Sequence, residues 1–194
     1  AIEAVKLTEA IVFPLPDRDG KMAETAFDIL KDLLPKMDAV LIGPGMGCSE
    51  DTSKVTATLL ESYKGTVILD ADGINVLAGH IDILRERTGT TILTPHEGEF
   101  IRAGGKLRGN RADSAAEFAE QTGSVILLKG HNTVITDGNV HYMNTTGNPG
   151  MAVGGSGDVL AGMITALAGQ GIDPLEAAAC AAWLHGAAGD ICAD

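Results

Sequence analysis

Small residues lead into an aspartate at the start of a helical run in the segment Gly154-Gly155-Ser156-Gly157-Asp158. Such residues leave main-chain N–H groups without partners, and the helix dipole adds positive potential at the same point. We therefore expect Gly154, Gly155, Ser156 and Gly157 to form an anion hole for a transferred phosphoryl group. Asp158 could instead be a first-turn carboxylate that only complements the helix dipole. The crowded glycines, with no Walker lysine after them, favour a base that accepts a proton from an attacking hydroxyl group.

A lysine directly follows the apolar run 124–128 and begins the segment Lys129-Gly130-His131-Asn132-Thr133. A lysine that stands beside glycine and a hydroxyl group after a buried strand can bind phosphate or ribose. The same residues would also suit a solvated turn before a hairpin. We favour the binding function for this segment.

Three more segments place glycine or polar side chains after apolar runs. Gly43-Pro44-Gly45-Met46-Gly47 allows a ligand to approach the backbone closely, but a tight turn between a strand and a helix uses the same glycines, so both interpretations stay open. Asp70-Ala71-Asp72-Gly73 and Thr94-Pro95-His96-Glu97 follow the next two apolar runs. Beyond them, Glu99 either holds a metal-bound water or only favours the first turn of a helix.

The histidines differ in their sequence context. His96 lies among the segments that carry chemistry, so we expect it to contribute to a site. His80, His141 and His185 have no such context, and we expect them to be structural.

An apolar strand, a polar loop and a helix alternate four times along the chain, with strands at 39–42, 66–69, 91–93 and 124–128. This alternation is typical of a parallel sheet with crossover helices. Ligands of such sheets bind in the crevice outside the carboxyl ends of the strands, so the segments described above should converge. A purely structural explanation is that turns need glycine and helix caps need Asp or Thr. That explanation accounts well for any one of these loops but poorly for all four together.

The pattern changes after the fourth strand. Residues 132–137 and 139–144 flank Asp137-Gly138, a strong short signal for a β-hairpin. Helical patterns then begin at Asp158 and run over 174–192 at the end of the chain. Earlier helices are predicted at 23–34, 50–63 and 112–121, and residues 1–20 are predicted as a loop.

Length and composition limit the alternatives. The 194 residues, 45% of them hydrophobic, suffice for one core, so we expect one domain over 1–194. A formal net charge of −12 argues against a broad nucleic-acid or anionic-membrane footprint, although backbone N–H groups and one lysine can still hold a phosphate locally. The cysteines show no metal-binding spacing, and Cys180 in an alanine-rich run is expected to be a small core residue. Without a membrane-spanning run or a signal peptide, the chain is expected in the cytoplasm.

Taken in order, these segments resemble the ADP/ATP-dependent NAD(P)H-hydrate dehydratases of the ribokinase-like superfamily. The resemblance runs from about residue 39 to about residue 192. The matching segments are Gly43-Pro44-Gly45-Met46-Gly47, Leu69-Asp70-Ala71-Asp72, Leu93-Thr94-Pro95-His96-x-Gly98-Glu99, Leu128-Lys129-Gly130-x-x-Thr133-Val134-Ile135 and Asn148-Pro149-Gly150-Met151-Ala152-x-Gly154-Gly155-Ser156-Gly157-Asp158-Val159-Leu160.

The resemblance implies a ribokinase-like three-layer α/β fold with a mostly parallel central sheet, helices on both faces and a late β-hairpin. It also implies an enzyme that phosphorylates the ring hydroxyl of hydrated NADH or NADPH from ADP or ATP and then eliminates phosphate, which restores the dihydronicotinamide. Asp158 would be the base on that hydroxyl. Gly47 and His96, with Asp158, would contact the hydrated cofactor. The nucleotide would contact Lys129, Gly130, His131, Asn132, Thr133 and Gly157.

Cofactor and partners also follow from the resemblance. Glu99 falls where related kinases carry a magnesium-associated acid, so Mg²⁺ is implied and would be held through water. The family further implies a homo-oligomer and an NAD(P)H-hydrate epimerase as a functional partner. From the net charge of −12 we expect no nucleic-acid or membrane partner.

Two features depart from the family pattern. Glu97 and Ser156 stand where Pro and Thr are commoner, and the family's opening segment, a glycine-rich stretch followed by the first strand and helix, is not matched, so we expect the chain to lack it. The alternatives are a ribokinase-like kinase of a small alcohol or vitamin precursor, and a non-catalytic nucleotide-binding module. Thr94-Pro95-His96 and Asn148-Pro149-Gly150-Met151 favour the dehydratase.

Overall fold

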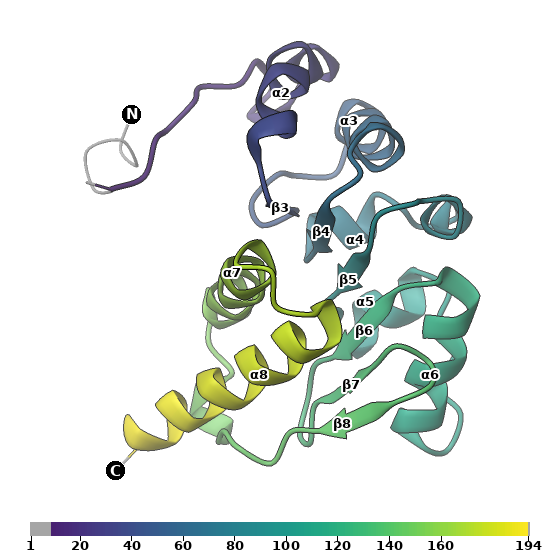
Figure 1. Cartoon of the computed structure of the whole chain (residues 1–194), viewed down its shortest axis with the longest axis vertical. Coiled ribbons are helices and arrows are strands. Elements are labelled where there is room, and N and C mark those ends of the chain that lie inside the picture. Colours follow the sequence, from purple (N-terminus) through teal and green to yellow (C-terminus); the bar gives the residue numbers. More distant parts are fainter. Residues whose placement is uncertain (1–8, 194) are drawn as a thin grey trace.

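The computed structural model describes residues 9–193, and its centre is a six-stranded sheet whose strands lie in chain order (Figure 1). The strands are β3 (Ala39–Ile42), β4 (Thr66–Leu69), β5 (Thr91–Leu93), β6 (Val125–Leu128), β7 (Val134–Thr136) and β8 (His141–Met143). The first four are parallel to one another, whereas β7 pairs antiparallel with both of its neighbours. The predicted mostly parallel sheet with a late β-hairpin is therefore confirmed.

Local sequence signals define the helices. The helices are α2 (Phe27–Leu33), α3 (Glu50–Ser62), α4 (Asp72–Asn75), α5 (Glu97–Arg102), α6 (Arg111–Thr122), α7 (Ser156–Gly169) and α8 (Pro174–Ile191). Ser49 and Thr52 form a reciprocal capping box at the start of α3, and Asn110 accepts from the Ala112 N–H at the start of α6. Asp173 caps α8, whose first residue is Pro174.

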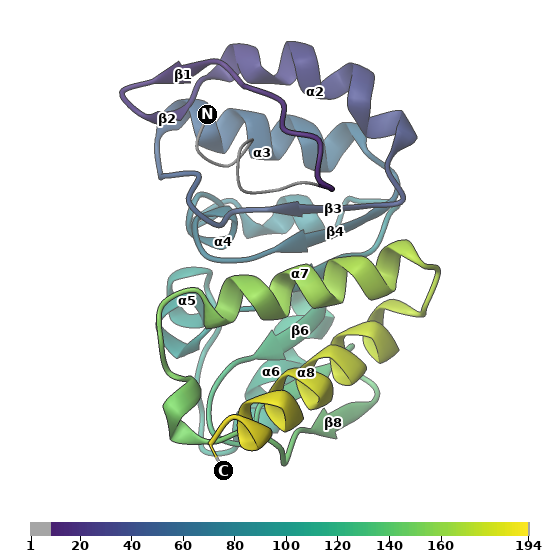
Figure 2. The ribbon, with the colours of Figure 1, turned by 90° about the vertical axis from the view of Figure 1, so that its left-hand side faces the viewer.

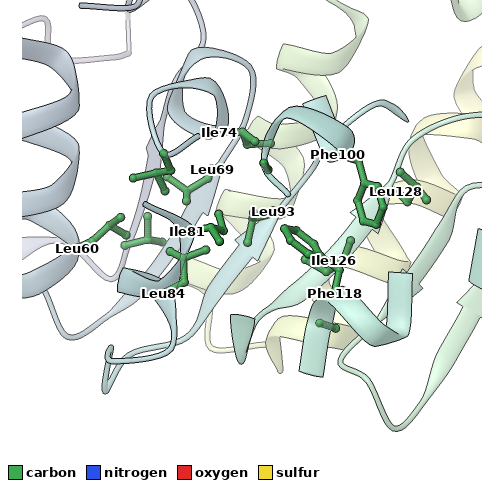
Figure 3. Close-up of a cluster of buried hydrophobic side chains, with 14 of the residues drawn as sticks. Leu60, Leu69, Ile74, Ile81, Leu84, Leu93, Phe100, Phe118, Ile126 and Leu128 are labelled. Atoms are coloured by element: carbon green, nitrogen blue, oxygen red, sulfur yellow. The ribbon is translucent and has the colours of Figure 1, made fainter. Parts of the chain in front are cut away.

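Alternate residues of the strands enter two different hydrophobic cores, one on each face of the sheet. One core joins Leu69, Leu93 and Ile126 to α3, α5 and α6, and the rings of Phe100 and Phe118 meet edge to face at 5.0 Å (Figure 3). The other core packs strand residues against α7 and α8, which lie together on the opposite side (Figures 1 and 2). These two cores give the predicted three layers, with helices on both faces.

Some elements differ from the expectation. Strand β1 (Asp17–Arg18) lies within the predicted loop 1–20 and forms a two-stranded hairpin with β2 (Lys21–Met22), just after that loop. Residues 1–8 of the predicted loop are outside the described part. The helix predicted at 23–34 is an α-helix only over Phe27–Leu33, with 3-10 turns at Glu24–Ala26 and Leu34–Lys36. The helix predicted from Asp158 begins two residues earlier. The expectation that Cys180 is a core residue is wrong, because Cys180 is exposed, whereas its helix buries Ala177, Ala178, Ala181 and Ala182.

Candidate active site

The carboxyl ends of the parallel strands meet at the end of the sheet where α4, α5 and α7 begin (Figure 2). Two glycines bring the first two loops into backbone contact. A Cβ on Gly43 would overlap the Asp70 carbonyl oxygen, and a Cβ on Gly73 would overlap the carbonyl oxygen of Ile42. These glycines are therefore needed for the close packing of the two loops. For the Gly43 segment, ligand approach and a tight turn had both stayed open, and at Gly43 itself the contact favours the structural role.

A buried charge cluster lies behind these loops, centred on the Lys129 ammonium group. Lys129 Nζ donates to Asp70 Oδ1 at 2.8 Å and lies 3.8 Å from Glu99 Oε2. Thr94 Oγ1 donates to the same Asp70 oxygen at 2.7 Å. The Asp70 and Glu99 side chains are only 2% and 7% exposed, and that of Lys129 is 22% exposed. The lysine thus compensates two carboxylates that burial would otherwise penalise.

The same ammonium group lies at the start of α7. A Cβ added to Gly157, the second residue of α7, would be 3.4 Å from Lys129 Nζ and 4.0 Å from Asp70 Oδ2. The lysine predicted to contact nucleotide and the glycine predicted for the anion hole are therefore neighbours, although they are 28 positions apart in the sequence. A cation and a helix N-terminus placed side by side both favour the binding of an anion.

The loop before α7 and the first turn of the helix contain main-chain N–H groups without hydrogen-bond partners among the described residues. Gly155, the N-cap, has φ +88°, and an added Cβ on Gly154 or Gly155 would meet open space. The Ser156 N–H donates to the Val153 carbonyl oxygen at 3.3 Å, while the N–H groups of Gly154, Gly155 and Gly157 have no hydrogen-bond partner in the described part of the chain. Three of the four expected anion-hole residues thus have an N–H group available.

His185 lies beside this loop. Its Nε2 is 3.5 Å from Ser156 Oγ, and desolvation lowers the pKa of the imidazole. The sequence offered no signal for this contact, because His185 belongs to α8 and reaches Ser156 only through the packing of α8 against α7.

His96 and Glu99 cap α5 together. His96 Nδ1 accepts from the N–H groups of Gly98 at 2.9 Å and Glu99 at 3.2 Å, so the ring proton lies on Nε2 when the imidazole is neutral. Glu99 Oε2 accepts from the His96 N–H at 2.9 Å, and Oε1 is 3.5 Å from His96 Nε2. The ring remains 54% exposed, which leaves it open to a ligand. The Glu99 carboxylate therefore links the helix cap to the charge cluster through Lys129.

Gly47 lies in the loop after β3, next to the Asp72 carboxylate. The Gly47 N–H donates to Asp72 Oδ2 at 2.8 Å, and Cys48 Sγ lies 3.3 Å from Asp72 Oδ1. Desolvation raises the pKa of the Cys48 thiol, and the hydrogen bond with Asp72 raises it further, so the thiol stays protonated at neutral pH. A Cβ on Gly47 would press on the Lys21 side chain, whose Nζ donates to the Cys48 carbonyl oxygen at 3.0 Å.

The segment from Lys129 to Thr133 is a tight turn between β6 and β7. Thr133 Oγ1 donates to the Gly130 carbonyl oxygen at 2.9 Å and accepts from the Gly130 N–H at 3.3 Å. Gly130 has φ +150° and Asn132 has φ +54°, and the side chains of His131 and Asn132 are exposed. The Lys129 N–H donates to the Pro95 carbonyl oxygen at 2.8 Å, so this turn is bonded directly to the loop of His96.

Asp158 is exposed, and its carboxylate makes no hydrogen bond or ion pair with residues 9–193. It lies one residue after Gly157 in the first turn of α7.

The sequence did not identify the residues that contact Lys129. Asp70 had a usable signal, since it directly follows a buried strand, whereas Arg111, which contacts the Lys129 turn, had none.

Two features were not found among residues 9–193. Within residues 9–193, there is no cluster of three or more His, Cys, Asp or Glu side chains that could hold a metal ion. Across the same residues, none of the helices combines the length and apolar character that crossing a membrane requires.

Known proteins resemble this chain over nearly its whole length. A bifunctional NAD(P)H-hydrate repair enzyme Nnr from Moorella thermoacetica is 44% identical over 97% of this chain, which spans 37% of that relative. The crystal structure of an ADP/ATP-dependent NAD(P)H-hydrate dehydratase from Bacillus subtilis, co-crystallised with ATP/Mg²⁺ and soaked with CoA, superimposes with a TM-score of 0.73. It is 34% identical, and the match covers 89% of this chain and 71% of the other.

A ribokinase-like superfamily protein from Enterococcus faecalis superimposes with a TM-score of 0.76 at 30% identity, over 88% of this chain and 61% of that protein. These matches confirm the ribokinase-like fold. The family model described as NAD(P)H-hydrate dehydratase matches residues 2–194. The resemblance drawn from the ordered segments is thereby confirmed, and this chain belongs to the NAD(P)H-hydrate dehydratase family.

Proposed function

We propose that this chain catalyses the nucleotide-dependent dehydration of hydrated NADH or NADPH. A hydroxyl group on the hydrated ring would give up its proton and attack the terminal phosphoryl group of ADP or ATP, and AMP or ADP would leave. The C–O bond to the new phosphate would then break as the neighbouring ring carbon loses a proton, so that phosphate leaves, a ring double bond forms and the dihydronicotinamide is restored. The observation that carries the proposal is the position of the Lys129 ammonium group, between two buried carboxylates and beside the N-terminus of α7.

The available groups suit phosphoryl transfer, in which catalysis rests on positioning and on stabilising charge. The N–H groups of Gly154, Gly155 and Gly157 would bind the transferred phosphoryl group, with Lys129 beside them. Asp158 is exposed and unpaired among residues 9–193, so it is free to accept the proton of the ring hydroxyl. Its place one residue after Gly157 would bring base and anion hole to the same substrate.

The two loops on either side would hold the substrates. The turn from Lys129 to Thr133 would bind the nucleotide, since its glycine and its exposed polar side chains lie next to the anion hole. The exposed ring of His96 and the loop at Gly47 would bind the hydrated cofactor. Both are at the carboxyl end of the sheet, where ligands of open α/β sheets bind.

Mg²⁺ fits this arrangement as a nucleotide-borne ion. Mg²⁺ commonly keeps several waters and takes one or two carboxylates together with substrate phosphates. Both Glu99 oxygens already face His96, at 2.9 Å and 3.5 Å, which suits contact through water rather than direct ligation. Asp70 Oδ2, on the side of Gly157, has no hydrogen-bond partner among the described residues. Bound Mg²⁺ would neutralise charge on the phosphates.

The test is recovery of absorbance at the dihydronicotinamide band, with NADH hydrate, Mg²⁺ and either ADP or ATP. We expect recovery that requires nucleotide, releases free phosphate and is lost in Asp158→Ala. A kinase of a small alcohol would instead transfer phosphate to its product without releasing it. If nucleotide binds but neither absorbance nor free phosphate appears, the dehydratase proposal is wrong.

Three further properties stay predictions. We expect residues 1–194 to form one domain that assembles into a homo-oligomer. Sedimentation of the purified chain would measure the oligomeric state. We expect the protein in the cytoplasm. An NAD(P)H-hydrate epimerase is the expected functional partner, since it would supply the epimer that the dehydratase accepts.

A further inference from the structure

We propose that Arg111 is a positioning residue that sets the conformation of the nucleotide-binding turn between Lys129 and Thr133. This inference rests on the proposed function only for the identity of the ligand. Its basis is a set of contacts that the guanidinium group makes with main-chain carbonyl groups of the turn.

The Arg111 guanidinium group binds three carbonyl oxygens of the turn and of the strand before it. Nη1 donates to the His131 carbonyl oxygen at 2.7 Å, and Nη2 donates to those of Lys129 at 2.8 Å and Leu128 at 3.3 Å. Hydrogen bonds from a charged donor are stronger than neutral ones, and the planar fork of arginine can serve several acceptors at once. Because Arg111 is the first residue of α6, these bonds fix the turn to a helix in the core layer.

Gly130 allows the guanidinium group to lie against the backbone. A Cβ on Gly130 would be 2.7 Å from Arg111 Nη2, and Gly130 has φ +150°. Arg111 binds the carbonyl oxygens of Lys129 and His131, and so fixes the backbone of the turn. In this conformation the Lys129 ammonium group reaches the charge cluster, and the exposed polar side chains of the turn are available to a ligand. Removal of Arg111 would free these carbonyl groups and let the turn change conformation.

Glu97 adds a weaker contact from the loop that carries His96. Glu97 Oε1 lies 3.2 Å from Arg111 Nε and forms an ion pair with it, but Nε has no hydrogen-bond partner in the described part of the chain. The Glu97 side chain is 56% exposed, so the ion pair contributes little. The three hydrogen bonds to carbonyl oxygens therefore dominate the contacts of Arg111. Because they hold the turn from Lys129 to Thr133, replacing Arg111 should change the affinity for nucleotide more than the affinity for the hydrated cofactor.

The experiment compares nucleotide binding by calorimetry, with ADP and Mg²⁺ and no hydrated cofactor, in wild type, Arg111→Lys and Arg111→Met. Arg108→Lys and Arg108→Met are the matched controls, because the Arg108 side chain is 65% exposed and, among the described residues, its guanidinium group pairs with Glu117 alone, at 3.8 Å. We expect Arg111→Met to raise the Kd for ADP by about tenfold or more and Arg111→Lys to give an intermediate value. Both Arg108 variants should stay within about twofold of wild type.

Steady-state kinetics separates positioning from general damage. In Arg111→Lys, the KM for nucleotide should rise with the Kd, while the KM for NADH hydrate stays within about twofold of wild type. Equal Kd values for wild type and Arg111→Lys, or a parallel rise of both KM values, would overturn the proposal. If Arg111→Met does not fold, Arg111→Lys decides, since it keeps the charge and the aliphatic stem. A wild type that binds ADP but restores no dihydronicotinamide would refute the function and leave the Kd comparison valid.

Discussion

Replacement of Lys129 by methionine should destabilise the protein far more than the loss of a surface lysine. The change leaves Asp70 and Glu99, 2% and 7% exposed, without the ammonium group that now lies 2.8 Å and 3.8 Å away. Removing one partner of a buried pair costs about 3–5 kcal/mol. Lys129 is itself 22% exposed, and Thr94 still donates to Asp70, so we expect about 2–4 kcal/mol.

The double mutant separates the charge effect from lost packing. Asp70→Asn alone should cost about 1–2 kcal/mol, since it weakens one charge-assisted hydrogen bond and keeps the shape of the side chain. In Asp70→Asn/Lys129→Met, one of the two uncompensated carboxylates is gone. The double mutant should therefore be no less stable than Lys129→Met alone, which corresponds to a coupling of about 1–2 kcal/mol.

Urea unfolding at neutral pH, followed by circular dichroism, gives the free energies of unfolding for this cycle. Lys54→Met is the control, because Lys54 is 48% exposed and pairs with Glu50 and Glu24 at the surface, so its loss should cost less than about 1 kcal/mol. A double mutant whose loss equals the sum of the two single losses would falsify the view that Lys129 compensates buried charge.

Three other changes test the site and its support. Asp158→Asn should lower kcat by about 10²–10⁴-fold with little change in the Kd for ADP, since it removes only a base; unchanged kcat would exclude Asp158 from that role. Gly157→Ala should fill the anion hole without a protein clash, so activity should fall while the thermal midpoint stays equal or rises, because alanine favours a helix interior; a large loss of stability would contradict this. The hydrogen bond from the Gly147 N–H lowers the pKa of Asp190 below its unfolded value of about 3.9. The stabilisation from Asp190 is then complete above that pH and lost below it, so the difference in urea midpoint between wild type and Asp190→Asn should be present at neutral pH and shrink at about pH 3.

The strands and the loops at their carboxyl ends were predictable because both signals are local. An apolar run of β-branched residues and leucine can be read without knowing its neighbours, and the residue after it lies at the strand end by definition. The hairpin β1–β2 was missed although Asp19-Gly20 is a good turn signal, because each strand has only two residues. Helix α4 follows Ala71 at φ +47°, a strained conformation that no local pattern predicts.

The contacts between side chains of distant segments were not predictable. Lys129 and Asp70 are 59 residues apart and meet only because β4, β5 and β6 lie side by side in register. Arg111 reads as an ordinary first residue of a helix, and His185 as one more side chain of an alanine-rich helix. In each case the partner is chosen by the packing of elements rather than by neighbouring residues in the sequence.

The chain order of the sheet has a consequence for how the protein forms during synthesis. From β4 to β8, each strand pairs with the strand made just before it, so the sheet can grow stepwise as the chain emerges from the ribosome. One face is covered along the way by α3, α5 and α6. The other face, which includes Ile68, Ile92 and Leu127, is covered only by α7 and α8, and these helices are synthesised after all six strands of the sheet. A nascent chain that pauses after β8 would expose this apolar face to solvent. A chaperone, or a second incomplete copy of the chain, would bind to that face.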